Sequence, residues 1–326
     1  MAMRMYDIID KKKKGSELTP KEITYMVEGY VAGEIPDYQV SAFLMAVYYE
    51  GMSEKELSVF TDSMAKSGDM VDLSQIKGIK VDKHSTGGVG DKTTLAVAPL
   101  VAACGGRVAK MSGRGLGFTG GTIDKLESIP GMQTAISEER FFEIVNDIGL
   151  SVIGQSAEIA PADKKLYALR DVTATVDSIP LIAASIMSKK LASGSDKIVL
   201  DVTVGSGAFM KNIDDAICLA QRMVEIGENA GRQTVAILTN MDVPLGEAVG
   251  NDIEVVEAIE TLQGKGPEDF RQICVEFAAY MLYLGEIADL ETSRKMVEDA
   301  IDYGKGIDKL AAMVKAQGGD ESYIYH

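Results

Sequence analysis

Histidine and cysteine are scarce in this sequence, and tryptophan is missing altogether. The histidines are His84 and the terminal His326, and the cysteines are Cys104, Cys218 and Cys274. No two cysteines have the CxxC spacing, and no Cys/His set has the spacing of zinc ligands, so we expect neither a disulfide framework nor a zinc site. The start of the chain has no apolar signal-peptide core, and we therefore expect a cytoplasmic protein.

Long hydrophobic runs are also missing, and no segment reaches the length of a membrane span. Basic residues are outnumbered, with 33 Lys and Arg against 49 Asp and Glu and a formal net charge of -16. A nucleic-acid-binding protein needs a broad basic face, so the composition argues against that class. A length of 326 residues with 46% hydrophobic residues predicts a globular chain of two domains.

The charge balance reverses in residues 83–114, where five lysines and arginines stand against a single acidic residue, Asp91. These are Lys83, Lys92, Arg107, Lys110 and Arg114. A local excess of positive charge in an acidic protein indicates a site for a small anion. The alternative is that these cations are solvated or pair with acids elsewhere. A second basic run, Lys11 to Lys14, precedes Gly15 and is typical of a solvated turn.

The first part of the chain has helical patterns. Thr19 is a candidate N-cap, Pro20 suits the first helical position, and Glu22 completes a capping box. The segment "SEKE", residues 53–56, repeats this device. We therefore predict a helical unit over residues 1–66.

After this unit, short β-branched runs alternate with longer helical patterns. The runs are "GIKVDKHS", "RVAKMS", "LSVIG", "KIVLDVTVG" and "QTVAILTN". The alternation predicts an α/β domain with a largely parallel, mixed sheet covered by helices. Residues 161–194 instead predict two helices, which we expect to pack on the N-terminal unit. The predicted domains are thus 1–66 with 161–193, and 67–160 with 194–326, with a cleft between them.

Glycine-rich loops follow the first two strands, where ligands bind in parallel sheets. The loop in "KHSTGGVGDKTT" offers Lys83, Ser85 and Thr94, and the loop in "KMSGRGLGFTGGT" offers Lys110, Ser112 and Thr122. Neither loop has the Walker or GxGxxG spacing. Glycine lets the backbone approach a ligand closely, so two such loops at neighbouring strand ends predict a site for one tetrahedral anion. The alternative is a pair of ordinary strand-to-helix turns.

A third set of polar residues lies in the predicted helices after residue 160. Ser185 and Lys189 are four residues apart and share a helical face, and Arg170 lies on the preceding helix. Such donors suit a planar ligand whose carbonyl oxygens gain negative charge. The alternative is a solvated helical face.

Several long stretches resemble the thymidine and pyrimidine-nucleoside phosphorylase family. They are "SGRGLGFTGGTIDKLES", "VDKHSTGGVGD", "PADKKLYALRDVTATVDSIPLIAASIMSKKLASG", "VLDVTVGSGAFM" and "GYVAGEIPDYQVSAFLMA". The resemblance covers essentially the whole chain, and "VAKMSGRG" is closer to the pyrimidine-nucleoside branch. It implies a fold like that of nucleoside phosphorylase class II and the reversible phosphorolysis of pyrimidine nucleosides. It also implies phosphate as co-substrate, no organic cofactor, and a homodimer formed through the N-terminal helices without nucleic acid or membrane.

The resemblance also implies roles for individual residues. The implied phosphate ligands are Lys83, Ser85, Thr94, Lys110, Ser112 and Thr122. Arg170, Ser185 and Lys189 would hold the base, with His84 beside its O2. Cleavage of the C–N bond leaves negative charge on the pyrimidine, so the expected catalytic residues are His84, Arg170 and Lys189. We expect His84 to act as a neutral hydrogen-bond donor, because the lysines around it disfavour a cation.

A potassium ion ties two segments together in the resembling family. The matching positions here are Gly90, Lys92, Leu245, Ala248 and Glu257. Lys92 departs from the pattern, because bacterial relatives often carry threonine there and an ammonium repels a cation at close range. An alternative is that Lys92 replaces the ion and pairs with Glu257. We predict weak or absent dependence on potassium.

Two further departures accompany the resemblance. Phe118 stands where many relatives have histidine, so a side-chain hydrogen bond near the sugar or base would be lost. The sequence stops near the point where the family's C-terminal, β-rich domain begins, so we expect that domain to be absent. The competing interpretations are a non-catalytic or split subunit of such an enzyme and a phosphoribosyltransferase of the anthranilate type.

Overall fold

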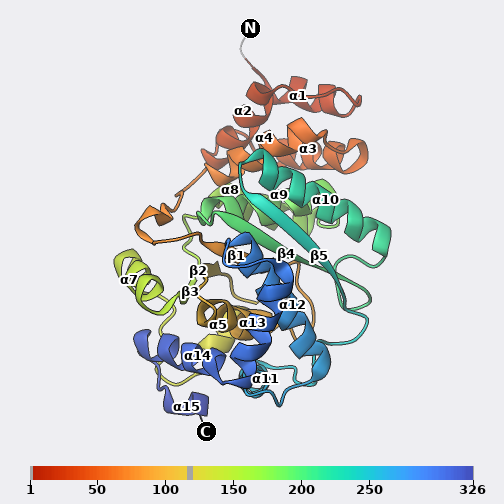
Figure 1. Ribbon diagram of the computed structural model, residues 1–326. Helices are drawn as coiled ribbons and strands as arrows, with labels where there is room; N and C mark the ends of the chain where they lie inside the picture. Colours follow the sequence, from red (N-terminus) through yellow and green to blue (C-terminus); the bar gives the residue numbers. More distant parts are fainter. Residues whose placement is uncertain (1–2, 116–119, 326) are drawn as a thin grey trace. The chain divides into compact units, whose positions relative to one another are not determined.

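The computed structural model describes residues 3–115 and 120–325, which form two compact units (Figure 1). The first unit comprises Met1–Val71, Ser156–Gly194 and Ile217–Arg232. The second unit comprises Asp72–Gln155, Ser195–Ala216 and Gln233–His326. The first unit thus joins two segments close to those expected for the helical domain with a third segment, 217–232, that was not expected there. The roles predicted for the two domains stay predictions.

The first unit is helical. Its helices are α1 (Met5–Lys12), α2 (Pro20–Val31), α3 (Asp37–Glu50), α4 (Glu54–Ala65), α8 (Pro161–Val172), α9 (Ile179–Ala192) and most of α10 (Ile213–Asn229). Both predicted capping boxes are confirmed: the side chains of Thr19 and Ser53 accept from the backbone N–H three residues on, and each N3 glutamate bonds back. The fully buried Phe43 and Phe60 pack in its core.

The prediction of a solvated turn at Lys11 to Lys14 is wrong for Lys11 and Lys12, which end α1. Lys12 belongs to α1 and is only 3% exposed. Its Nζ lies 3.0 and 2.9 Å from the two carboxylate oxygens of Glu56, which is also buried. A buried charge needs such a partner, and Glu56 comes from a distant helix that the local sequence does not reveal.

The second unit contains all five strands of the described residues. The strands are β1 (Val81–Ser85), β2 (Val108–Ser112), β3 (Leu150–Gly154), β4 (Lys197–Val204) and β5 (Gln233–Asn240). β4 lies between β1 and β5, β2 pairs with β3, and all three ladders are parallel. β1 and β2 are joined before their first residues by a parallel bridge between Lys80 and Arg107. The carboxyl ends of β1 and β2 therefore lie at the same edge.

Helices connect and cover these strands. They are η1 (Leu73–Gln75), α5 (Thr93–Ala103), α6 (Thr122–Leu126), α7 (Glu138–Ile148), α11 (Asn251–Leu262), α12 (Glu268–Leu284), α13 (Leu290–Asp302), α14 (Lys305–Ala316) and α15 (Ser322–Tyr325). Figure 1 shows α5 and α11–α14 gathered on one side of β1–β3. The core of the unit lies there, where Val81 and Val199 of the strands pack with Phe277 and Leu310 of the helices. This packing fixes the loops that leave β1 and β2.

Candidate functional site

A buried lysine links β1 and β2. Lys110 of β2 is 4% exposed, and its Nζ donates to Asp82 Oδ1 of β1 at 3.0 Å. The same Nζ donates to the backbone oxygen of Lys83. Ser85 and Ser112, which end the two strands, therefore belong to neighbouring segments, and their role in a shared anion site stays a prediction.

Hydroxyl-bearing residues stand at these strand ends and at the helix starts that follow them in the sequence. Thr94 lies in the first turn of α5, Thr122 begins α6, and Ser112 ends β2. None of these three hydroxyls has a hydrogen-bond partner among residues 3–115 and 120–325. Ser85 Oγ accepts from Gly87 N at 3.1 Å and keeps its own proton to donate. Four hydroxyl groups that can donate thus stand at these strand ends and helix starts.

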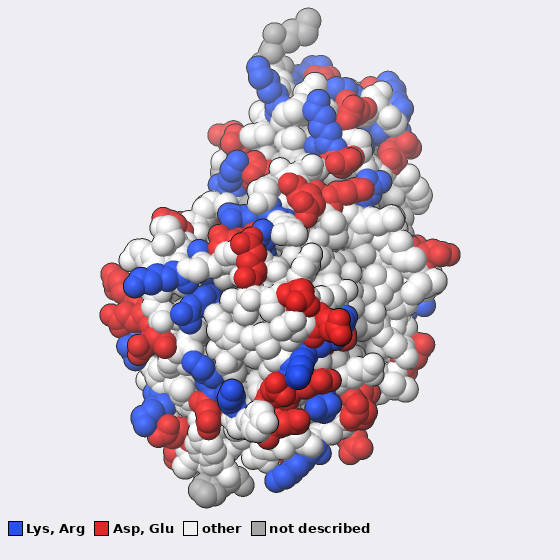
Figure 2. Space-filling model, viewed as in Figure 1, with Lys and Arg blue, Asp and Glu red and all other residues white. Residues whose placement is uncertain are grey.

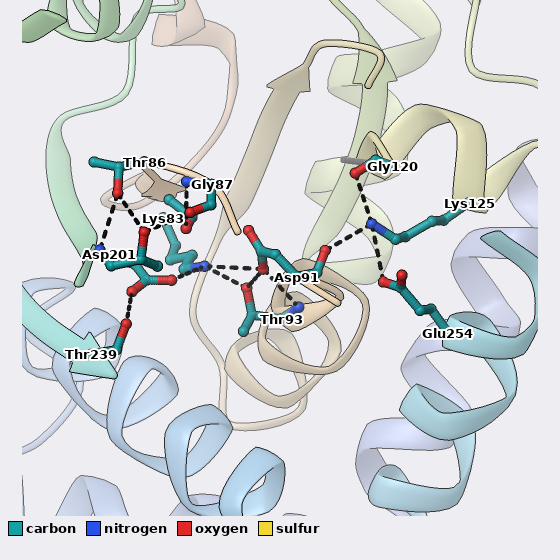
Figure 3. Close-up of polar contacts among 12 residues, drawn as sticks. Lys83, Thr86, Gly87, Asp91, Thr93, Gly120, Lys125, Asp201, Thr239 and Glu254 are labelled. Carbon is teal, nitrogen blue, oxygen red and sulfur yellow. Dashed lines mark hydrogen bonds and ion pairs between the residues drawn. The ribbon is translucent and has the colours of Figure 1, made fainter. Parts of the chain in front are cut away.

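The ammonium of Lys83 lies in a buried network. It is 3.1 Å from Asp201 Oδ2 and 3.8 Å from Asp91 Oδ1, and it donates to the Thr93 hydroxyl (Figure 3). Burial disfavours the cation, but the charges of Asp91 and Asp201 outweigh burial and raise the pKa of Lys83. Burial likewise opposes ionisation of Asp91, yet Lys83 and the Thr93 hydroxyl hold its pKa well below the usual range.

Carboxylates neutralise most of the basic segment. Lys83 pairs with Asp201, Lys110 with Asp82, and Lys92 with Glu257. Arg114, which is exposed, pairs with Asp124 and Glu127. The interpretation of pairing with acids elsewhere is therefore the right one for these four cations. At the surface, too, acidic and basic side chains are interspersed over the face that Figure 2 shows.

Lys92 stands at a position where the resemblance implies a potassium ligand. Its side chain is 0% exposed, and its Nζ donates to the backbone oxygens of Leu245 and Ala248, both at 2.8 Å. The same ammonium forms an ion pair with Glu257 of α11. Gly246 has a φ of +67°, and a Cβ there would lie 2.3 Å from Glu257 and 3.1 Å from Lys92 Nζ, so only glycine fits.

A second buried lysine links the two glycine-rich loops. Lys125 of α6 donates to the backbone oxygens of Asp91 and Gly120 and pairs with Glu254 of α11 (Figure 3). Lys125 and Glu254 were missed, because each stands at an ordinary polar position of a helical pattern. Asp82 and Asp201 were also missed, although an acid inside an apolar strand is a usable signal that a buried cation lies nearby.

The first unit carries the residues predicted to bind a base. Lys189 Nζ donates to Ser185 Oγ at 3.2 Å and to Asp163 Oδ2 at 2.5 Å. Ser185 and Asp163 are each 6% exposed. The second carboxylate oxygen of Asp163 has no hydrogen-bond partner among the described residues. Asp163 lies in the first turn of α8 and contacts Lys189, but the sequence did not predict this contact.

Arg170 is 2% exposed and holds the turn between α8 and α9. Its guanidinium donates to the backbone oxygens of Thr175 at 3.2 Å, Val176 at 2.7 Å and Leu181 at 3.1 Å. A guanidinium has five N–H groups, so two remain after these three bonds. Burial lowers the pKa of Arg170, and the base-binding role stays a prediction.

His84 and Phe118 are the remaining positions expected at the site. His84 is half-buried on β1, in register with Leu200 of β4. Phe118 lies outside the described residues. Within the described ranges, no group of three His, Cys, Asp or Glu side chains could hold a metal ion. No helix in these ranges combines the length and apolar character needed to cross a membrane.

Comparisons with known proteins agree with this architecture. A family model described as "Glycosyl transferase family, a/b domain" matches residues 77–307, and one described as "Glycosyl transferase family, helical bundle domain" matches residues 6–68. The chain is 57% identical to the pyrimidine-nucleoside phosphorylase of Geobacillus stearothermophilus, over 99% of this chain and 75% of the relative. It is 56% identical to the enzyme of that name from Staphylococcus aureus, with the same coverage.

A solved structure shows the same fold at low identity. The anthranilate phosphoribosyltransferase of Thermus thermophilus superposes with a TM-score of 0.76 at 17% sequence identity. The match covers 95% of this chain and 99% of that structure. At this identity the likeness concerns the fold alone.

Proposed function

Because the chain belongs to the family of the pyrimidine-nucleoside phosphorylases, we infer that it is a pentosyltransferase that catalyses the reversible phosphorolysis of pyrimidine nucleosides. A pyrimidine nucleoside and inorganic phosphate give the free base and a pentose 1-phosphate. Phosphate is the co-substrate, and the reaction needs no organic cofactor.

Phosphate is bound by hydroxyl groups of the second unit. The observation that carries this proposal is the set of three unpartnered hydroxyls, on Thr94, Ser112 and Thr122, with Ser85 beside them. Phosphate oxygens accept several hydrogen bonds, and these donors have no competing protein acceptor among the described residues. Lys83 and Lys110 provide positive charge close by, although both already have carboxylate partners.

The base is bound by the first unit. Lys189 uses two of its three N–H groups on Asp163 and Ser185, so one remains, and Ser185 can still donate its own proton. Two N–H groups of Arg170 add further donors. A uracil or thymine ring offers carbonyl oxygens on either side of an N–H, and the unpartnered oxygen of Asp163 is an acceptor in the same cluster.

The reaction moves negative charge onto the base. A phosphate oxygen forms a bond to C1′ as the C–N bond breaks, and the bonding electron pair leaves with the pyrimidine, where it spreads onto the carbonyl oxygens. Arg170, Lys189 and His84 stabilise this charge as hydrogen-bond donors, each with an effect of about 10²–10³ in rate. In this proposal the first unit supplies the base ligands and the second unit supplies the phosphate ligands.

Potassium has no role in this chain. The support is the position of Lys92, whose ammonium is 2.8 Å from both carbonyl oxygens and paired with the carboxylate that would otherwise hold the ion. A second cation at these ligands would meet strong repulsion. We therefore propose that Lys92 supplies in covalent form the charge that an ion would bring.

The protein forms a homodimer through its N-terminal helices and acts in the cytoplasm. The support for the dimer is a set of exposed aromatic side chains on α1 and α3, where Tyr6 is 67%, Tyr38 is 74% and Tyr49 is 78% exposed. Exposed aromatic groups of this kind are enriched at protein interfaces. Analytical ultracentrifugation tests this part of the proposal, and a monomer at micromolar concentration contradicts it.

The function is tested by incubating the purified chain with uridine, thymidine or deoxyuridine, with and without inorganic phosphate. We expect phosphate-dependent release of uracil or thymine. A non-catalytic subunit releases no base under either condition. A phosphoribosyltransferase of the anthranilate type instead consumes a phosphoribosyl diphosphate and leaves nucleosides intact, so the three interpretations give different results.

A further inference from the structure

One buried ammonium contacts three separate segments of the second unit. Lys125 is 1% exposed, and its Nζ lies 2.9 Å from the backbone oxygen of Asp91 and 2.9 Å from that of Gly120. It is also 3.1 Å from Glu254 Oε2, and Figure 3 shows the three contacts radiating from the same nitrogen. Two N–H groups of this ammonium donate to backbone oxygens, and its charge is paired with the buried carboxylate of Glu254.

The two carbonyl partners belong to the loops that carry the proposed phosphate ligands. Asp91 lies in the loop that leads from β1 into α5, which bears Thr94, and Gly120 lies in the loop that leads from β2 to Thr122. The hydroxyls of these two threonines have no partner among the described residues. Lys125 therefore fixes the distance between two loops that are otherwise separate in sequence.

The anchoring of Lys125 is rigid. Glu254 lies in the first turn of α11, is 3% exposed, and also accepts from Gly250 N at 3.1 Å. Next to Gly120, the backbone of Gly121 packs closely on that of Gly115, since a Cβ at Gly121 would lie 2.2 Å from the backbone nitrogen of Gly115. The carbonyl that Lys125 holds at Gly120 thus adjoins closely packed backbone.

We propose that Lys125, held by Glu254, is a positioning residue that couples the two glycine-rich loops so that their hydroxyls bind one phosphate. This inference rests on the proposed function, because it assigns Lys125 to the same phosphate site. The alternative is a buried ion pair that only supports the fold. The two differ in one respect: a purely structural pair affects stability without affecting phosphate binding.

The test measures phosphate binding directly, from the rise in melting temperature as phosphate is added. The variants are Lys125→Met and the double variant Lys125→Met/Glu254→Met, which leaves no unpaired buried charge and is therefore expected to fold. The matched controls are Lys12→Met and Lys12→Met/Glu56→Met, which remove an equally buried ion pair from the first unit. We expect both Lys125 variants to raise the Kd of phosphate by about tenfold, the effect of losing charge-assisted hydrogen bonds that hold a site.

Catalysis adds a second readout. In the Lys125 variants the KM for phosphate is expected to rise about as much as its Kd, while the KM for the nucleoside stays within about twofold of wild type. A wild-type Kd for phosphate in the double variant overturns the inference, and so does an equal loss in the Lys12 controls. The proposed function fails separately, if the wild-type protein binds phosphate but releases no base.

Discussion

Replacing Lys92 by threonine tests whether an internal ammonium takes the place of a bound ion. The substitution removes the ammonium but leaves its three partners, the oxygens of Leu245 and Ala248 and the carboxylate of Glu257. One oxygen of Glu257 keeps its bonds from the backbone N–H groups of Glu247 and Ala248, at 2.8 and 3.0 Å. The other oxygen loses its cation inside the protein.

The expected loss of stability follows from this burial. Removing one partner of a buried ion pair lowers the free energy of unfolding by about 3–5 kcal/mol. Lys92 is 0% exposed, so solvent screening does not reduce this figure. For a unit of this size the loss corresponds to a fall in melting temperature of about 6–20 °C. Potassium that enters the vacated position at about 100 times its Kd restores about 2.7 kcal/mol.

The assay is urea unfolding in potassium chloride and in sodium chloride at equal ionic strength. Wild-type stability and activity are expected to be the same in both salts, whereas Lys92→Thr is less stable in sodium and partly recovers in potassium. Lys80→Thr is the control, because Lys80 also forms an ion pair in this unit, with Asp196. Removing the Lys80 ammonium leaves no set of carbonyl oxygens among the described residues that could bind potassium. Strong activation of the wild-type protein by potassium over sodium refutes the reasoning.

Two further predictions concern the β1 end and its loop. His84→Ala should lower kcat by about 10²–10³ with little change in the Kd of phosphate, because it removes a donor to the departing base, and unchanged turnover takes His84 out of the mechanism. Asp91→Asn should lower the free energy of unfolding at pH 7, since the folded-state pKa of Asp91 is depressed chiefly by Lys83 against the effect of burial. The stability that ionised Asp91 contributes is present above its unfolded pKa of about 3.9 and disappears as pH falls through its folded pKa. The difference in free energy of unfolding between Asp91→Asn and wild type should therefore shrink below about pH 4. A difference that is constant from pH 7 to pH 3 contradicts this assignment.

Local features of the fold could be predicted from the sequence because their causes are local. The capping boxes at Thr19 and Ser53 depend on residues three positions apart, and both are present. The run "LSVIG" forms β3 with the predicted bounds, Leu150–Gly154. Each relies on propensity and turn chemistry within a few residues.

Charge partners could not be predicted in the same way. Lys83 pairs with Asp201, which is 118 residues away, and Lys12 with Glu56, which is 44 residues away. Such pairs depend on strand order and helix packing, and the sequence pattern does not reveal that β4 lies next to β1. This is why the basic segment predicts free positive charge, while among residues 3–115 and 120–325 it is the hydroxyls of Thr94, Ser112 and Thr122 that have no partner.

The central claim is that phosphate itself attacks the sugar of a pyrimidine nucleoside bound by this chain. The most direct measurement follows labelled oxygen, by incubating the wild-type protein with uridine and fully ¹⁸O-labelled inorganic phosphate and analysing the sugar product by mass spectrometry. The account predicts ribose 1-phosphate that retains every labelled oxygen, including the one bonded to C1′. Free ribose carrying an oxygen from water, or uracil release that does not depend on phosphate, would contradict it.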